Sequence, residues 1–153
     1  SLLSLIINSH WADILDVEYG HELMDTRVLI SQAKAKGLTV LMSYHKFKRA
    51  MSETELIDTL ENMKSLKADI LKIAVMPKTP KDTAALLSAA ARVSEVYPDT
   101  PIITIGMGEV GQLTRIAGNT LGAPLTFAAG KAASAPGQLT AAEVKRLFDI
   151  LYK

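Results

Sequence analysis

Cysteine is absent from the 153 residues, and aromatic residues make up only 5% of them. Without thiols the chain has no disulfide framework, no thiolate nucleophile and no zinc–thiolate site. A lack of disulfides is typical of reducing compartments, so we expect a cytoplasmic protein. The 17 basic and 16 acidic residues leave a net charge of +1, with no basic stripe for nucleic acid. No apolar run approaches the roughly 18 residues of a membrane helix, so no membrane contact is expected.

The N-terminal stretch is apolar from Ser1 to Asn8, but it has neither a basic leader nor a small-residue cleavage site. It is therefore not predicted to be a signal peptide. The chain starts without methionine, inside what the pattern indicates is a helix, so we expect the natural protein to extend upstream. Length and an apolar content of 48% are those of one ordinary globular domain, here residues 1–153.

Five short apolar runs, rich in β-branched residues, alternate with helical segments. They cover residues 12–18, 38–45, 68–76, 101–107 and 123–129. The runs are almost continuously apolar, as expected of parallel strands that are covered on both faces. The sequence therefore predicts an α/β protein with a parallel sheet.

Helix starts are marked by side chains that can satisfy free backbone amides. Ser52 with Glu55, and Thr140 with Glu143, have the spacing of capping boxes, and Pro80 fits a first helical position. The repeated strand–helix units fit either an open doubly wound sheet or part of a (β/α)₈ barrel. The pattern alone slightly favours the open sheet, because five strands cannot close an eight-stranded barrel.

The most informative single residue is Lys72, in the middle of the run 68–76. Strand alternation puts it on one face with Ile70, Ala74 and Met76. Burial in a covered strand disfavours the charged form of an amine, which is how a Schiff-base lysine becomes nucleophilic. A structural lysine paired with a carboxylate is the alternative.

His45 ends the preceding strand, at the edge where parallel sheets place their sites, and an imidazole there suits a general base. A hydrogen-bonded structural histidine is the alternative. Asp16 and Glu18 share one face of the first strand and could orient His45 or balance a cationic lysine; the alternative is that they are solvated charges at the strand end. The spacing of these carboxylates and of the scattered histidines is not a metal signature, so no metal site is predicted.

The segment from Gly106 to Gly111 matches G-x-G-x-x-G after a strand, the pattern of a dinucleotide-binding turn. The acidic residue expected about 20 positions later is missing, since no Asp or Glu occurs between Glu109 and Glu143. A nucleotide-binding protein is therefore kept only as an alternative.

Arg115 follows this turn, where a guanidinium can hold a carboxylate through two parallel hydrogen bonds; the alternative is a surface arginine. After the fifth run comes a small-residue loop, 130–138, which can close on a ligand and present Ser134 and Gln138 as hydrogen-bond partners. A plain connection is the alternative for this loop.

Several segments, taken in order, resemble type I 3-dehydroquinate dehydratases. The similar segments are MSYHKF (42–47), DILKIAVMP (69–77), PIITIGM (101–107), RIAG (115–118) and SAPGQ (134–138). The resemblance covers essentially the whole chain. Lys46, where many members have an acidic or amide residue, and Gly106, in place of a common serine, are mild departures.

The resemblance implies a (β/α)₈ barrel, of which this chain supplies about the last five units, and an enzyme that dehydrates 3-dehydroquinate without a cofactor. It implies that Lys72 forms a Schiff base and that His45 is the general acid/base. Arg115 would bind substrate, and Met107 would line the pocket. Ser134 and Gln138 are implied as further substrate ligands, whereas Asp16 and Glu18 are assigned only support.

The family's first three units have no counterpart in the chain, so its site is expected to be incomplete and the chain to be part of a longer protein. Three other interpretations stay open: another Schiff-base lyase such as a class I aldolase, an inactive fragment or binding module, and a nucleotide-binding protein. A homodimer is also left open.

Overall fold

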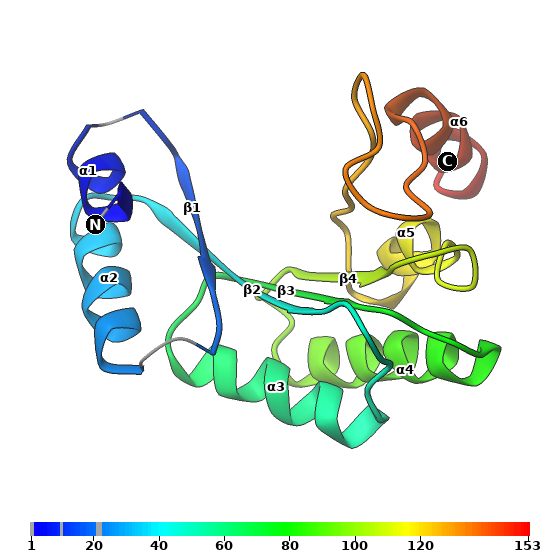
Figure 1. Cartoon of the computed structure of the whole chain (residues 1–153), viewed down its shortest axis with the longest axis horizontal. Coiled ribbons are helices and arrows are strands. Elements are labelled where there is room, and N and C mark those ends of the chain that lie inside the picture. The colour runs from blue at the N-terminus through cyan, green and yellow to red at the C-terminus, as the bar shows by residue number, and fades with distance from the viewer. Residues whose placement is uncertain (1, 10, 21–22) are drawn as a thin grey trace.

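The computed structural model describes residues 2–9, 11–20 and 23–153. Figure 1 shows a sheet with helices beneath it and at both ends. The elements in chain order are α1 (Leu2–Ser9), β1 (Ile14–Glu18), α2 (Leu23–Ala35), β2 (Thr39–Lys46), α3 (Glu53–Ser65), β3 (Ile70–Val75), α4 (Pro80–Val96), β4 (Ile102–Gly106), α5 (Thr114–Ala117), the 3₁₀ turn η1 (Gly118–Leu121) and α6 (Ala141–Leu151).

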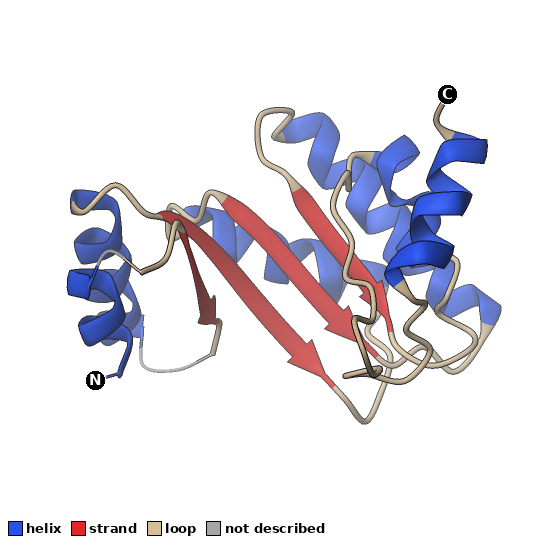
Figure 2. Cartoon of the chain, turned by 90° about the horizontal axis from the view of Figure 1, so that it is seen from above, coloured by secondary structure: helices blue, strands red, loops and turns tan. Residues whose placement is uncertain are grey.

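The four strands are all parallel and lie in the order β1-β2-β3-β4, and Figure 2 shows their arrows pointing the same way. Each strand therefore pairs with the next strand along the chain. A doubly wound sheet reverses its strand order at a switch point, whereas a (β/α)₈ barrel does not. The observed order is that of a barrel segment, not of the open sheet that the pattern alone slightly favours.

The two faces of the sheet differ in what covers them. A large core on one face packs strand residues such as Val40, Leu71 and Ile73 against the helices, and α3 and α4 lie beneath the sheet in Figure 1. A smaller cluster occupies the other face: Leu41, Ile70, Ala74, Ile103, Ile105 and Met107, with Met76 against it. The predicted alternation along β3 is therefore confirmed, and Lys72 belongs to the second face.

The predicted helix starts are confirmed. Capping boxes at Ser52–Glu55 and Thr140–Glu143 form both reciprocal hydrogen bonds. A third box joins Thr79 to Asp82, and the predicted Pro80 is the first helical residue after Thr79. Each box satisfies two amides that the helix itself leaves unpaired, so the local sequence fixes where α3, α4 and α6 begin.

The predicted fifth strand over residues 123–129 is wrong. This segment is irregular, and only Ala129 forms an isolated bridge, to Thr140. A strand needs a neighbour to complete its hydrogen bonds, and an apolar run alone does not provide one. Here the carbonyl of Phe127 accepts from the Arg115 side chain instead.

The glycine-rich segment forms a tight turn closed on itself. A Cβ on Gly106 would lie 2.7 Å from the Gly111 Cα, so neither position has room for a side chain. The Thr114 hydroxyl accepts from the Gly106 amide at 2.7 Å and donates to the Gly111 carbonyl at 2.8 Å. Backbone packing therefore explains these glycines without a nucleotide. Over the described part of the chain, no helix is both long and apolar enough to cross a membrane.

Candidate active site

Strand register brings the predicted polar residues to one place on the inner face. Glu18 of β1 is the register partner of Ser43 in β2, and Ser43 is the partner of Lys72 in β3. Asp16 and His45 lie two residues away on the same faces of their strands. The result is a line of five polar side chains across three neighbouring strands.

The Lys72 amine lies between a carboxylate and an aromatic ring. Its Nζ is 3.4 Å from Asp16 Oδ2 and 4.5 Å from the centre of the Phe127 ring. Only 12% of the lysine side chain is exposed, against 46% for that of Asp16. The pairing predicted as an alternative for Lys72 is therefore present, but the long contact and the exposed partner make it weak.

His45 is held by one carboxylate at two points. Its Nδ1 lies 2.7 Å from Glu18 Oε2, and its backbone amide donates to Oε1 at 3.1 Å. The imidazole also stacks on the Phe47 ring, with centroids 5.6 Å apart and planes 6° from parallel. In the tautomer that carries its proton on Nδ1, the imidazole donates a hydrogen bond to Glu18 and presents Nε2 to a ligand. Glu18 thus contacts both the backbone and the ring of His45.

Ser43 connects the two carboxylates. Its hydroxyl lies 2.6 Å from Asp16 Oδ1 and 2.9 Å from Glu18 Oε2, and the residue is only 2% exposed. With these contacts, hydrogen-bonding distances run without a break from the amine of Lys72 to the imidazole of His45.

Arg115 is buried, contrary to the surface alternative. Its guanidinium donates to the carbonyls of Phe127 at 3.1 Å and Pro136 at 3.4 Å, whereas Nε has no partner among the residues that the structure describes. Burial lowers the pKa of the guanidinium from its ordinary value. A buried guanidinium whose Nε–H is unpaired within the described part of the chain is suited to bind an anionic ligand.

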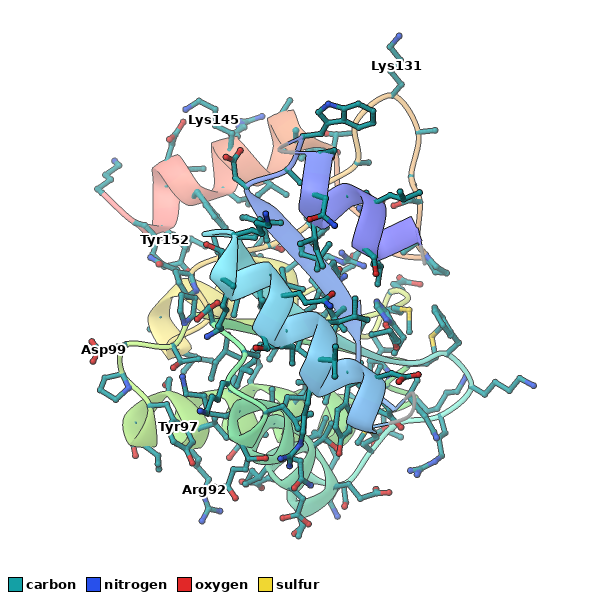
Figure 3. The ribbon with its side chains drawn as sticks, turned by 90° about the vertical axis from the view of Figure 1, so that its left-hand side faces the viewer. Arg92, Tyr97, Asp99, Lys131, Lys145 and Tyr152 are labelled. Atoms are coloured by element: carbon teal, nitrogen blue, oxygen red, sulfur yellow. The ribbon has the colours of Figure 1, made fainter. Side chains whose placement is uncertain are left out.

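One cavity of about 240 Å³ joins the reactive groups to the predicted ligand-binding residues. It is lined by His45, Phe47, Lys72, Ala74, Ile105, Met107, Arg115, Phe127, Ser134, Ala135 and Gln138. Ser134 donates to Gln138 Oε1 from both its amide and its hydroxyl, at 2.8 and 3.1 Å, which closes the base of the loop. Lys131, labelled in Figure 3, projects from the loop away from the body of the chain.

Sequence reasoning missed three residues of this site. Ser43 lies two residues before His45 in β2, so strand alternation alone could have placed it on the same face. Phe47 and Phe127 lie outside the strands, where periodicity says nothing about direction. Among the described residues, no group of three or more His, Asp or Glu side chains could hold a metal ion.

The unreversed strand order and the polar cavity at the carboxyl ends of the strands define a segment of a (β/α)-barrel protein. The model of one barrel family, described as type I 3-dehydroquinase, matches residues 1–153. The chain therefore belongs to the type I 3-dehydroquinase family.

Curated relatives and solved structures agree with this family. A 3-dehydroquinate dehydratase from Bacillus licheniformis is 37% identical over 100% of this chain and 60% of its own length. A 3-dehydroquinate dehydratase from Clostridium kluyveri is 43% identical over 91% of this chain and 54% of its own length. A type I enzyme from Clostridium difficile, solved with covalently modified comenic acid, superposes with a TM-score of 0.92 at 35% identity, over 98% of this chain and 59% of that one. The chain thus spans about 60% of the length of these relatives.

Proposed function

We propose that the protein containing this chain dehydrates 3-dehydroquinate to 3-dehydroshikimate in the shikimate pathway, through an imine on Lys72. The observation that carries the proposal is the Lys72 amine, largely withdrawn from water and opening into the same cavity as His45. The names of the curated relatives support the substrate. The cytoplasmic location, the homodimer and the single domain stay predictions of the sequence.

The chemistry follows from the order of the groups. The neutral Lys72 amine attacks the C3 carbonyl, and water leaves to form an iminium, which withdraws electrons and acidifies the C2 proton. His45 takes that proton through Nε2 and returns it to the C1 hydroxyl, which leaves as water. A second water then hydrolyses the imine and frees the amine. No metal or organic cofactor enters this sequence of steps.

The rest of the cavity suits the remainder of the substrate. The free Nε of Arg115 is a donor for the substrate carboxylate. Ser134 and Gln138 offer hydroxyl and amide groups from the loop, and Met107 supplies an apolar wall. We infer that these four residues bind and orient the substrate while Lys72 reacts.

Borohydride reduction tests the imine directly. With 3-dehydroquinate and borohydride, the active protein containing this chain should gain the mass of a reduced adduct on Lys72. Lys72→Ala should abolish the adduct. Lys78→Ala, which removes an exposed lysine just beyond the same strand, should retain it. An adduct on another lysine, or none, would rule out the proposed mechanism.

A thermal-shift comparison separates the alternatives. Stabilisation by 3-dehydroquinate but not by NAD(P) supports the proposal. Stabilisation by NAD(P) alone would favour the nucleotide-binding protein. An adduct on Lys72 with other ketones but not with 3-dehydroquinate would favour a different Schiff-base lyase. Stabilisation by 3-dehydroquinate without turnover would favour a binding module.

A further inference from the structure

The hydroxyl of Ser43 has two hydrogen-bond acceptors within reach but only one proton to donate. It lies within hydrogen-bonding distance of Asp16 and Glu18 together, yet a hydroxyl carries a single proton. If both carboxylates were ionised, Ser43 would donate to one and turn a lone pair toward the other. Ser43 is buried, so water cannot take its place. The two contacts of the Ser43 hydroxyl are both hydrogen bonds only when Asp16 and Glu18 together carry one additional proton.

The Ser43 hydroxyl lies between Lys72 and His45, the two groups that react in the proposed mechanism. Asp16 Oδ2 contacts the Lys72 amine, and Glu18 Oε2 contacts Nδ1 of His45. The nearby Arg115 lines the same cavity, but its guanidinium donates to the carbonyl oxygens of Phe127 and Pro136. The line of five groups therefore has a reactive nitrogen at each end.

We propose that Ser43 is a positioning residue that passes a proton between Asp16 and Glu18, and so links the protonation of Lys72 to that of His45. The inference rests on the proposed function. The transfer starts from the arrangement in which the additional proton that Ser43 requires lies on Asp16 Oδ1. The Lys72 ammonium gives a proton to Asp16 Oδ2, Asp16 gives its Oδ1 proton to Ser43, and Ser43 gives its own to Glu18 Oε2.

The step conserves protons and charge. Lys72 ends as a neutral amine and Glu18 as a neutral acid, whereas Asp16 and Ser43 keep the same number of protons as before. The amine becomes nucleophilic without water entering the cavity. The carboxyl group of Glu18 still contacts Nδ1 of His45, so Nε2 remains directed to the substrate proton. The reverse transfer restores the starting state.

Ser43→Ala tests the relay in the active protein that contains this chain. Imine formation is measured under single-turnover conditions by rapid quenching into borohydride, alongside steady-state kinetics. Imine formation should slow by about 10²-fold, the lower end of what positioned acid–base groups contribute. KM should stay within about twofold, because Ser43 is not among the residues that line the cavity.

Two further variants separate a relay from a structural role. Ser43→Thr keeps the hydroxyl and should recover most of the rate. Thr104→Val removes another buried hydroxyl, one without a hydrogen-bond partner that alternation places on the helix-covered face, and should leave the rate unchanged. A structural defect from losing the Ser43 hydroxyl would instead lower the thermal unfolding temperature and raise KM together.

Deuterium gives a measurement on the unaltered protein, independent of how the variants fold. The imine-formation rate should fall along a curve as the D₂O fraction rises, since several protons move together, and along a straight line in Ser43→Ala. A straight line in the unaltered protein, or imine formation in Ser43→Ala within about threefold of normal, would overturn the relay alone. No imine in the unaltered protein would overturn the proposed function as well.

Discussion

Glu18 holds His45 by its backbone and its ring at once, so the imidazole has one orientation and one free nitrogen. The stacked Phe47 ring adds a second constraint on the plane of the imidazole. Such fixed geometry is what a general acid/base requires, because the proton must travel a defined path in each direction.

His45→Ala should leave imine formation intact and slow turnover by 10²–10⁴-fold, the usual contribution of a positioned acid/base. Borohydride trapping measures the first effect and steady-state kcat the second. Glu18→Gln is the matched control: it keeps an acceptor for the imidazole but removes the charge, and should give a smaller loss. A loss of less than about tenfold in His45→Ala would reduce His45 to a structural residue.

Arg115 holds two carbonyl groups in the fold and has a proposed role in substrate binding, and one substitution would remove both. Arg115→Ala should raise KM more than it lowers kcat, because a carboxylate anchor binds ground and transition states alike. It should also destabilise the fold by about 1–3 kcal/mol, because the Phe127 and Pro136 carbonyls lose a charged donor.

Arg115→Lys separates these two functions. It keeps the charge without the planar fork, so it should recover part of the stability and little of the substrate affinity. Thermal unfolding and substrate titration report the two separately. An unchanged KM in both variants would show that another group binds the carboxylate.

How far the sequence predicts the site depends on where each residue lies. Within strands, alternation correctly put Asp16 and Glu18 of β1 on the same inner face as His45 and Lys72, because a two-residue period fixes direction. Outside strands no period exists, so the ring of Phe127 over Lys72 could not be foreseen. The assigned catalytic and binding roles stay predictions.

Among the elements, four strands and the starts of three helices follow from local rules, whereas the fifth strand does not form. A capping box is complete within four residues and therefore needs nothing distant. A strand depends on a neighbour, and residues 123–129 have none among the described residues apart from the bridge at Ala129. Apolar composition gave neither a hydrogen-bonded strand nor full burial there, since Leu125 and Phe127 are 45% and 42% exposed.

Helix α3 carries a pH-sensitive start. The Arg49 side chain and the Ser52 backbone amide lower the pKa of Glu55 to about 2. The pKa of a glutamate in the unfolded chain is about 4. The lowered pKa therefore stabilises the folded state fully at pH values above about 4, and this stabilisation is lost as the pH falls through about 2. The effect is modest because the group is exposed.

Glu55→Gln should therefore flatten the fall in thermal unfolding temperature between about pH 5 and pH 2, relative to the unaltered protein. Glu61→Gln, at an exposed position of the same helix, is the control and should leave the pH profile unchanged. Parallel profiles for the unaltered protein and Glu55→Gln would mean that the capping carboxylate does not couple to folding.

At the scale of the whole molecule, β1 and β4 are the outer strands of the described sheet. Apolar side chains are exposed near the β1 edge, with Trp11 89% and Ile14 52% accessible. Open edges and bare apolar groups favour association with other chains.

A polypeptide limited to residues 1–153 should therefore self-associate and lack dehydratase activity. Mixing it with the first three barrel units of a relative should restore part of both properties. Size-exclusion chromatography and a dehydratase assay check the two outcomes. A monomer of residues 1–153 that turns over 3-dehydroquinate at an ordinary enzymatic rate would contradict this prediction.

The unreversed order of the sheet also bears on how the chain acquires its structure during synthesis. Every strand pairs with the one that follows it, so each new strand–helix unit can dock on the unit before it as soon as it leaves the ribosome. No strand has to wait for a distant partner, which keeps the entropy lost on loop closure small at each step. The line from Lys72 to His45 is complete once β3 has paired, before the last third of the chain has emerged.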